Sequence, residues 1–287
     1  MAPQYLAQEF LRMEGFTEIE YIAVGTKPGP AVLANGQADF TMWFSPGLIP
    51  PMDDGDPIVV LAGVHAGCYE LFGNESVNSI RDLKGKTIAV QWFGGGDHIF
   101  MASMLAYVGM DPTRDVHWVS GENSLQGAMD MFIDGRADAF LAFDPQPHEM
   151  RARNLGKVIV NTTLDRPWSQ YFCCMIAANR DYVRRYPVAT RHVVRAILKS
   201  ADICSSDPER AARYLSDYGY ETRYPVGLSV MRVLPYDRWR HANPEDTLRF
   251  HALRLYEVGM IKTNPNRLIE QGTDWRFLNE LKREMKA

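Results

Sequence analysis

Short apolar runs recur along the chain and are separated by segments with a helical period. Runs typical of buried strands lie at 38–42, 57–62, 87–91 and 137–143. Between them, segments such as 3–14 and 97–107 repeat apolar residues three and four positions apart, as on one face of a helix. The alternating stretch 18–24 predicts a further strand. Strands that alternate with helices predict an α/β fold with open, mostly parallel sheets flanked by helices.

One sub-pattern occurs twice and indicates two similarly built lobes. Gly36-Gln37-Ala38-Asp39 and Gly135-Arg136-Ala137-Asp138 each follow a predicted helix and precede a predicted strand. We predict a discontinuous lobe I of residues 1–67 and 173–287, and a lobe II of residues 68–172. The strand predicted at 171–179 would carry the chain back to lobe I, where a mainly helical tail follows.

Composition and charge narrow the function classes. The 287 residues are 46% hydrophobic and 23% charged, and the net charge is −4. This balance gives no electrostatic reason to expect nucleic acid or an anionic membrane as a partner. No apolar segment approaches the roughly 18 residues that span a bilayer. Mixed charge and ample apolar content are typical of an ordinary globular protein.

The cysteines predict no metal centre. Cys68, Cys173, Cys174 and Cys204 match no zinc-ligand spacing, since no CxxC or paired histidine accompanies them. The adjacent Cys173 and Cys174 are expected to be packed thiols rather than a vicinal disulfide. No Ser/His/Asp, P-loop or metal constellation is present in the sequence, so we expect no catalytic residue and no cofactor.

A glycine loop is the clearest candidate for ligand contact. The strand predicted at 87–91 is followed by Gly94-Gly95-Gly96-Asp97 at the start of a predicted helix. Free backbone N–H groups at such a helix start can hold a polar ligand. The alternative is a tight strand-to-helix turn with Asp97 as its N-cap. Because a carboxylate at this position already occupies the positive helix end, Asp97 argues against a strongly anionic ligand.

Several segments together resemble a known family. They are Ala34–Asp39, Ile80–Lys86, Gly135–Ala139 and Tyr186-Pro187 with the helix after it. Their order and spacing resemble the periplasmic solute-binding proteins of ABC importers, in the nitrate/sulfonate/taurine and thiamine-pyrimidine-precursor group. The resemblance implies the hinged two-lobe type II fold, a small-molecule ligand in the cleft, a membrane permease as partner, a monomer and an extracytoplasmic location.

The N-terminus departs from that group. Its members usually begin with a strand before the helix that carries Ala-Pro-x-Tyr-Leu-Ala, whereas here Met1 stands in place of that strand. No basic segment followed by an apolar segment, as in a signal peptide, precedes the helix. We therefore expect that a leader was removed or that the start was shortened.

Candidate ligand-binding residues follow from the rule that ligands lie outside the carboxyl ends of strands in open α/β sheets. They are Trp43, Phe44, Ser45, His65, Trp92, Gly94, Gly95, Gly96, Asp97, His98, Phe143 and Asp144, and the crossing strand would add Tyr171. The aromatic rings could hold a flat ring or belong to the core. The histidines could bond a heterocycle or simply be packed. Asp144 could accept a hydrogen bond from an amino group or cap the following helix.

These residues favour a binding protein for a small aromatic or heterocyclic, pyrimidine-like or sulfonate-type solute. One alternative is an enzyme like the thiamine-pyrimidine synthases of this fold, which carry a cysteine-rich segment and hold pyridoxal phosphate on a lysine. Phe172-Cys173-Cys174 echoes that segment in part, but the predicted cleft loops contain no lysine. Another alternative is the ligand-sensing module of a regulator, although no helix-turn-helix or basic patch is found.

Overall fold

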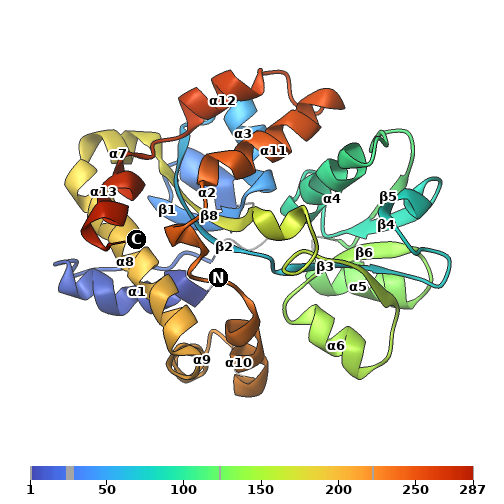
Figure 1. The fold of residues 1–287 in the computed structure, drawn as a ribbon, viewed down its shortest axis with the longest axis horizontal. Coiled ribbons are helices and arrows are strands. Elements are labelled where there is room, and N and C mark those ends of the chain that lie inside the picture. The colour runs from blue at the N-terminus through green and yellow to red at the C-terminus, as the bar shows by residue number, and fades with distance from the viewer. Residues whose placement is uncertain (1, 24–28, 123, 222, 287) are drawn as a thin grey trace.

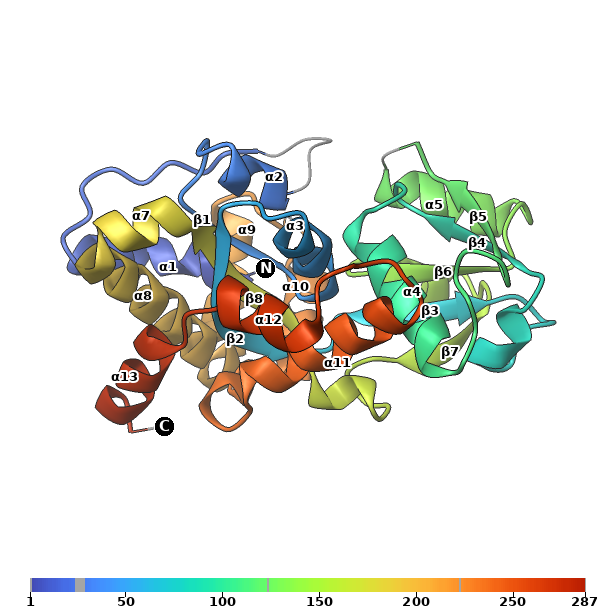
Figure 2. The ribbon, with the colours of Figure 1, turned by 90° about the horizontal axis from the view of Figure 1, so that it is seen from above.

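The computed structural model describes residues 2–23, 29–122, 124–221 and 223–286. The molecule has two lobes, each built on its own sheet with helices on the sheet faces (Figures 1 and 2). Residues 16–23 form no helix or strand, so the strand predicted over 18–24 is wrong for its described part. Val24 lies outside the described residues.

The sheet of the first lobe has the order β1-β8-β2. It contains β1 (Phe40–Phe44), β2 (Ile58–Ala66) and β8 (Phe172–Asn179). The central strand β8 is antiparallel to both neighbours, with Phe44 opposite Cys174 and Gly63 opposite Met175. The prediction of mostly parallel sheets is therefore wrong for this lobe. The physical reason is that β8 brings the chain back from the second lobe and runs against β1 and β2.

Most of the helices cover the first lobe. They are α1 (Ala2–Met13), α2 (Gly29–Ala34), α3 (Ile49–Asp53), α7 (Arg180–Arg185), α8 (Pro187–Ser206), α9 (Pro208–Asp217), α10 (Tyr224–Val233), α11 (Pro244–Glu257), α12 (Pro265–Gly272) and α13 (Arg276–Glu284), with the 3₁₀ turns η1 (Pro46–Leu48) and η4 (Arg238–Arg240). Helix α8 starts at Pro187, whose fixed φ suits a first helical turn. Its buried face includes Val193, Ile197 and Ala201 and packs against α1.

The sheet of the second lobe has the order β5-β4-β6-β3-β7. Its strands are β3 (Tyr69–Gly73), β4 (Thr87–Val90), β5 (His117–Ser120), β6 (Ala139–Phe143) and β7 (Lys157–Asn161). Strand β4 is parallel to β5 and β6, while β3 is antiparallel to β6 and β7, so this sheet is mixed. Its helical segments are η2 (Ile80–Leu83), α4 (Gly96–Tyr107), α5 (Leu125–Ile133) and α6 (Gln146–Ala152).

The chain passes between the lobes at two places that lie close together. One is Gly67-Cys68, between β2 and β3, and the other is Tyr171, between η3 (Trp168–Gln170) and β8. The lobes also touch where α4 packs against α11 and η1 (Figure 2). One buried apolar cluster extends through this contact and includes residues of both lobes, among them Met175, Leu71 and Phe100. Sites at the lobe boundary are therefore enclosed by elements of both lobes.

The lengths and apolar content of the helices among the described residues bear on membrane spanning. None of these helices combines the length and the apolar character needed to cross a bilayer.

Candidate functional site

A cavity of about 160 Å³ lies at the boundary between the lobes. The second lobe and its crossing contribute Cys68, Phe143, Asp144 and Pro145. The first lobe contributes Ala2, Tyr5, His65, Leu215, Tyr220, Glu221, Val226, Gly227, Val230, Met231, Leu234 and Tyr236. A small apolar cavity with a few polar groups is the usual form of a ligand site. Three of the candidates from the sequence, His65, Phe143 and Asp144, line this cavity.

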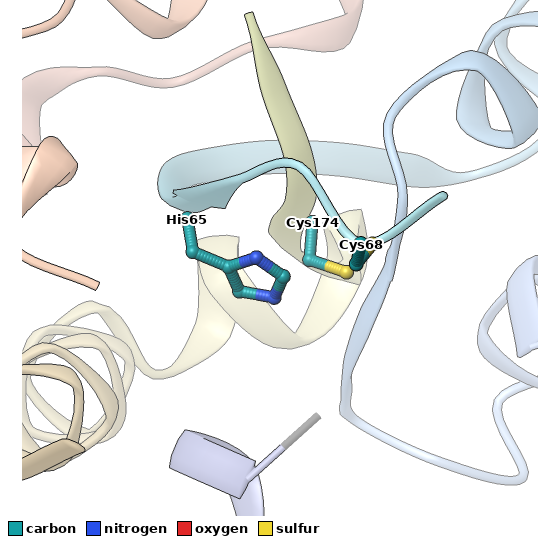
Figure 3. A group of neighbouring side chains, drawn as sticks. All are labelled: His65, Cys68 and Cys174. Carbon is teal, nitrogen blue, oxygen red and sulfur yellow. The ribbon is translucent and has the colours of Figure 1, made fainter. Parts of the chain in front are cut away.

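His65 lies within β2, on the first-lobe side of the cavity, and its side chain is buried (Figure 3). Its Nδ1 is 3.2 Å from the Ala66 carbonyl oxygen, while Nε2 has no hydrogen-bond partner among the described residues. Burial lowers the pKa of His65 to about 3, so the ring is neutral at physiological pH. The Tyr236 ring lies beside it, with ring centres 5.0 Å apart. His65 therefore offers an unused nitrogen to the cavity region.

The charged side chains among the described lining residues are carboxylates. Asp144 follows β6, its Oδ1 lies 3.5 Å from the His148 Nε2, and burial raises its pKa to about 6. Glu221 is the second acidic residue of the lining and pairs with Arg223, Nε to Oε1 3.1 Å. No lysine or arginine is among the described residues that line the cavity. Among the described lining residues the charged side chains are therefore acidic, and Glu221 is already paired with Arg223.

An aromatic cluster joins the lobes beside the cavity. The Phe44 ring of β1 meets the Phe143 ring of β6 edge to face, with ring centres 5.1 Å apart. Tyr69 lies 5.0 Å from Phe44 and 5.4 Å from Phe143, also between ring centres. Trp43 is buried in the first lobe against Gly29 and Gly47 and does not line the cavity. Phe143 alone of these rings reaches the cavity surface.

The glycine loop lies against the first lobe rather than on the main cavity. A Cβ added to Gly96 would be 3.0 Å from the Phe44 ring, and one added to Gly47 would be 3.2 Å from the Gly96 Cα. A Cβ on Gly95 would lie 2.8 Å from the Trp92 ring. Only glycine permits this approach of the backbone. Trp92 and Gly94, Gly95 and Gly96 therefore gather where α4 begins.

Asp97 and His98 complete this second group of candidates. The N-cap of α4 is Gly95, so the alternative of Asp97 as N-cap is wrong. Asp97 Oδ2 accepts a hydrogen bond from the Gln91 N–H at 2.6 Å, while its buried Oδ1 has no partner among the described residues. Burial raises the pKa of Asp97 to about 6. His98 Nδ1 accepts from the Gly94 N–H at 3.0 Å, and burial lowers the pKa of His98 to about 4.

Ser45 and Tyr171 line a separate, much smaller hollow of about 10 Å³. The Ser45 hydroxyl donates to the Phe172 carbonyl oxygen at 2.6 Å. Tyr171 stacks on Phe250 of α11, with ring centres 4.2 Å apart. This volume suits about one water molecule. Apart from Trp43 and Phe44, the candidates thus divide among three places: the main cavity, the start of α4 and this hollow.

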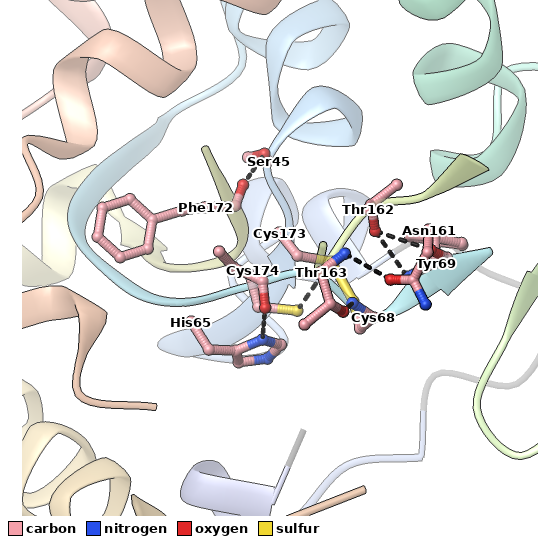
Figure 4. The surroundings of a disulfide bond; sticks show 11 residues. Ser45, His65, Cys68, Tyr69, Asn161, Thr162, Thr163, Phe172, Cys173 and Cys174 are labelled. Atoms are coloured by element: carbon pink, nitrogen blue, oxygen red, sulfur yellow. Dashed lines mark hydrogen bonds between the residues drawn. A yellow bond between two sulfur atoms is a disulfide. The ribbon is translucent and has the colours of Figure 1, made fainter. Parts of the chain in front are cut away.

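The cysteines differ from the sequence prediction. Cys68 and Cys173, which are 105 positions apart, form a disulfide that joins the two crossings (Figure 4). Cys173 is therefore not a packed thiol, although the absence of a Cys173–Cys174 bond is as predicted. Cys174 and Cys204 are free and buried. Sequence spacing could not reveal this pair, because only the return of β8 brings Cys173 beside Cys68.

Sequence reasoning missed the tyrosines of the cavity. Tyr5 of α1 stacks on Tyr220, which precedes α10, with ring centres 3.9 Å apart. Tyr236 comes from the helical tail, which carries no strand end and hence no signal under the rule used. The only hint was the cluster of aromatic residues after Gly219.

Solved structures share this fold. The nitrate-binding protein NrtA of Synechocystis PCC 6803 is 15% identical, with a TM-score of 0.78, and the match covers 99% of this chain and 85% of that chain. A putative sulfonate-binding SsuA of Methylobacillus flagellatus KT is 21% identical, with a TM-score of 0.67 and coverage of 99% and 89%. The desulfurization enzyme DSZB is 14% identical, with a TM-score of 0.65 and coverage of 100% and 96%. The fold is thus that of the periplasmic binding proteins.

The amino-acid sequence itself identifies the family. A search of curated protein sequences gave no significant match. The family model described as NMT1/THI5 like matches residues 2–211. Because this match spans most of the chain, the protein belongs to the NMT1/THI5-like family.

Proposed function

We propose that this protein is a solute-binding subunit that captures a small neutral or cationic heterocycle, such as an aminopyrimidine, in the cavity between its lobes. The observation that carries the proposal is the charge of the lining: Asp144 and Glu221 are acidic, and no described residue of the lining is a lysine or arginine. A buried anion without a facing cation would be strongly disfavoured at such a surface.

The shape of the cavity supports the same ligand class. Its volume of about 160 Å³ is below that of pockets for drug-sized ligands, which suits a single small ring. Phe143, Tyr220 and Tyr236 offer aromatic surfaces, the unused Nε2 of His65 can accept from an N–H or O–H group, and Asp144 can accept from an amino group. One flat ring with exocyclic donors would use all of these groups.

The proposal extends to partners and location. A protein of this kind acts outside the cytoplasm and delivers its ligand to the permease of an ABC importer, as a monomer. The Cys68–Cys173 disulfide agrees with an oxidising compartment. A synthase that holds pyridoxal phosphate on a lysine is less well supported, because no described residue of the cavity lining is a lysine.

A thermal-shift comparison tests the proposal. Purified protein is heated with 4-amino-2-methylpyrimidine derivatives, with a pyridinium compound, with taurine and with nitrate, each over a range of concentrations. We expect the melting temperature to rise with the concentration of the heterocycles, since a ligand that binds only the folded state stabilises it by mass action. Stabilisation by taurine or nitrate, with no response to the heterocycles, would overturn the assignment of ligand class. Native mass spectrometry checks that the bound compound is unchanged, because turnover would instead indicate an enzyme.

A further inference from the structure

Three metal-ligating side chains gather where the chain crosses between the lobes, and Cys173 lies beside two of them. One ring nitrogen of His65 and the sulfurs of Cys68 and Cys174 all lie within 4.8 Å of one another, and all three residues are buried (Figure 3). The sulfur of Cys173 is bonded to that of Cys68 and lies 3.9 Å from that of Cys174 (Figure 4). The cluster therefore offers one imidazole and three sulfurs from β2, the first crossing and β8.

The separations suit a small tetrahedral ion. Zinc–sulfur bonds of about 2.3 Å in tetrahedral geometry place two ligand sulfurs about 3.8 Å apart. The distance between the Cys173 and Cys174 sulfurs, 3.9 Å, already has this value. Three thiolates with one imidazole form one of the standard structural zinc sites. We propose that, once the Cys68–Cys173 disulfide is reduced, His65, Cys68, Cys173 and Cys174 form a site for one Zn²⁺ ion.

An unpartnered polar atom points independently to a ligand at this place. His65 is 2% exposed, and its Nε2 has no hydrogen-bond partner among the described residues. Its Nδ1 lies 3.2 Å from the Ala66 carbonyl oxygen, so a proton on Nδ1 leaves the lone pair on Nε2. A backbone carbonyl that holds the second ring nitrogen in this way is the usual companion of a metal-bound histidine. A zinc ion bound to Nε2 would give this atom the partner that it lacks among the described residues.

The disulfide and the zinc site exclude one another. Reduction breaks the bond between the Cys68 and Cys173 sulfurs, takes two electrons and two protons from a dithiol, and leaves two thiols and an oxidised dithiol. Zinc then displaces the thiol protons as it binds. In both states the crossing at Cys68 is linked to β8. His65 and Cys68 border the main cavity, which provides a path for the ion. Zinc on the His65 Nε2 would occupy the atom that the proposed solute uses as an acceptor, so zinc and that solute should compete at His65.

Zinc uptake by reduced and oxidised protein tests the proposal. Whole protein is reduced with excess dithiothreitol without oxygen, freed of the reagent, exposed to Zn²⁺ and then desalted. We expect about one zinc per reduced chain by elemental analysis, and less than about a tenth of that for the oxidised chain. Cobalt in place of zinc should give the visible bands of a tetrahedral site and thiolate-to-cobalt absorption. Absence of zinc from the reduced protein, or equal uptake by the oxidised protein, would overturn the proposal.

Variants locate the site. His65→Ala and Cys174→Ser should each weaken zinc binding by at least about tenfold. Cys204→Ser is the matched control, because Cys204 is also a buried free cysteine but belongs to α8 and not to the cluster, so it should bind zinc as the parent does. Loss of zinc from the Cys204 variant would contradict the assignment.

A measurement on the unmutated chain covers the case in which a variant fails to fold. Zinc should slow alkylation of Cys68, Cys173 and Cys174 in the reduced protein, while the alkylation rate of Cys204 should not change. If zinc leaves the alkylation rate of each of the four cysteines unchanged, the proposal is overturned.

Discussion

The hydroxyl oxygen of Ser103 and the Nδ1 of His251 lie 2.9 Å apart, across the boundary between the two lobes. Ser103 belongs to α4 of the second lobe and His251 to α11 of the first, and both side chains are buried. Burial lowers the pKa of His251 to about 3, so this is a bond between neutral groups. It joins the lobes next to the chain crossings, because His251 lines the same small hollow as Gly67 and Tyr171.

Removal of the Ser103 hydroxyl should favour the open arrangement of the lobes. In Ser103→Ala, the His251 Nδ1 loses its partner in a buried place, which costs about 1–3 kcal/mol of the free energy of unfolding. Small-angle X-ray scattering should show a larger radius of gyration than in the parent. Ser200→Ala is the control, since the Ser200 hydroxyl bonds Ala196 within α8, and it should leave the radius unchanged. An unchanged radius in Ser103→Ala would show that this bond does not hold the lobes.

Phe143 should contribute to ligand affinity. In Phe143→Ala, the cavity loses an aromatic wall and the contact with Phe44 across the lobes, a loss of about 1–2 kcal/mol. The dissociation constant for an aminopyrimidine probe should therefore rise about tenfold in calorimetric titration. Phe93→Ala is the matched control, because Phe93 is 60% exposed and does not line the cavity. Equal affinities of the two variants would argue against the cavity as the binding place.

The charge of Asp144 should control affinity for a cation. Its pKa of about 6 means that the carboxylate is present above this pH and protonated below it. Affinity for a permanently charged pyridinium should fall about tenfold per pH unit below 6 and stay level above it, as measured by titration at several pH values. Asp144→Asn should bind weakly at all pH values. Glu149→Gln, an acidic residue of α6 outside the cavity lining, should keep the parental profile.

Asp97 should make stability depend on pH in the acid range. Burial raises its pKa in the folded state to about 6 from 3.8, so the folded protein holds this proton more tightly than the unfolded chain. The stabilising contribution is present below pH 4 and is lost as the pH rises to about 6. The unfolding free energy of the parent minus that of Asp97→Asn should therefore fall by about 2 kcal/mol between pH 4 and pH 6 in denaturant titrations, and by about 3 kcal/mol over the whole titration. A difference that is constant with pH would contradict the raised pKa.

Parts of the fold could be predicted because they depend on local patterns. Glycines such as Gly36 and Gly135 end helices in the left-handed conformation, and Ala137-Asp138 leads into β6. The resemblance to solute-binding proteins agrees with the family match and with the fold of the solved structures. The alternation of apolar and polar residues at 18–24 wrongly predicted a strand, because the described residues 18–23 have no neighbouring strand with which to pair.

The candidate site was only partly predictable, because some of its residues come together through tertiary packing and not through a local pattern. The rule of strand ends found His65, Phe143 and Asp144, which border one cavity. It could not find Tyr220 or Tyr236, since these come from the helical tail and reach the cavity by tertiary packing. It also grouped the Gly94–Gly96 loop with the cavity, whereas the loop packs on Phe44 and Gly47.

By itself the sequence determined the order of most helices and strands, the lack of excess basic charge and the family, because periodicity, composition and short motifs are local properties. Only the tertiary structure decided which residues meet where β8 brings the chain back to the first lobe. Running antiparallel between β1 and β2, this strand places Cys173 against Cys68 and Cys174 near His65. Residues more than a hundred positions apart meet there because backbone pairing and burial, which act over the whole chain, set the register of that strand.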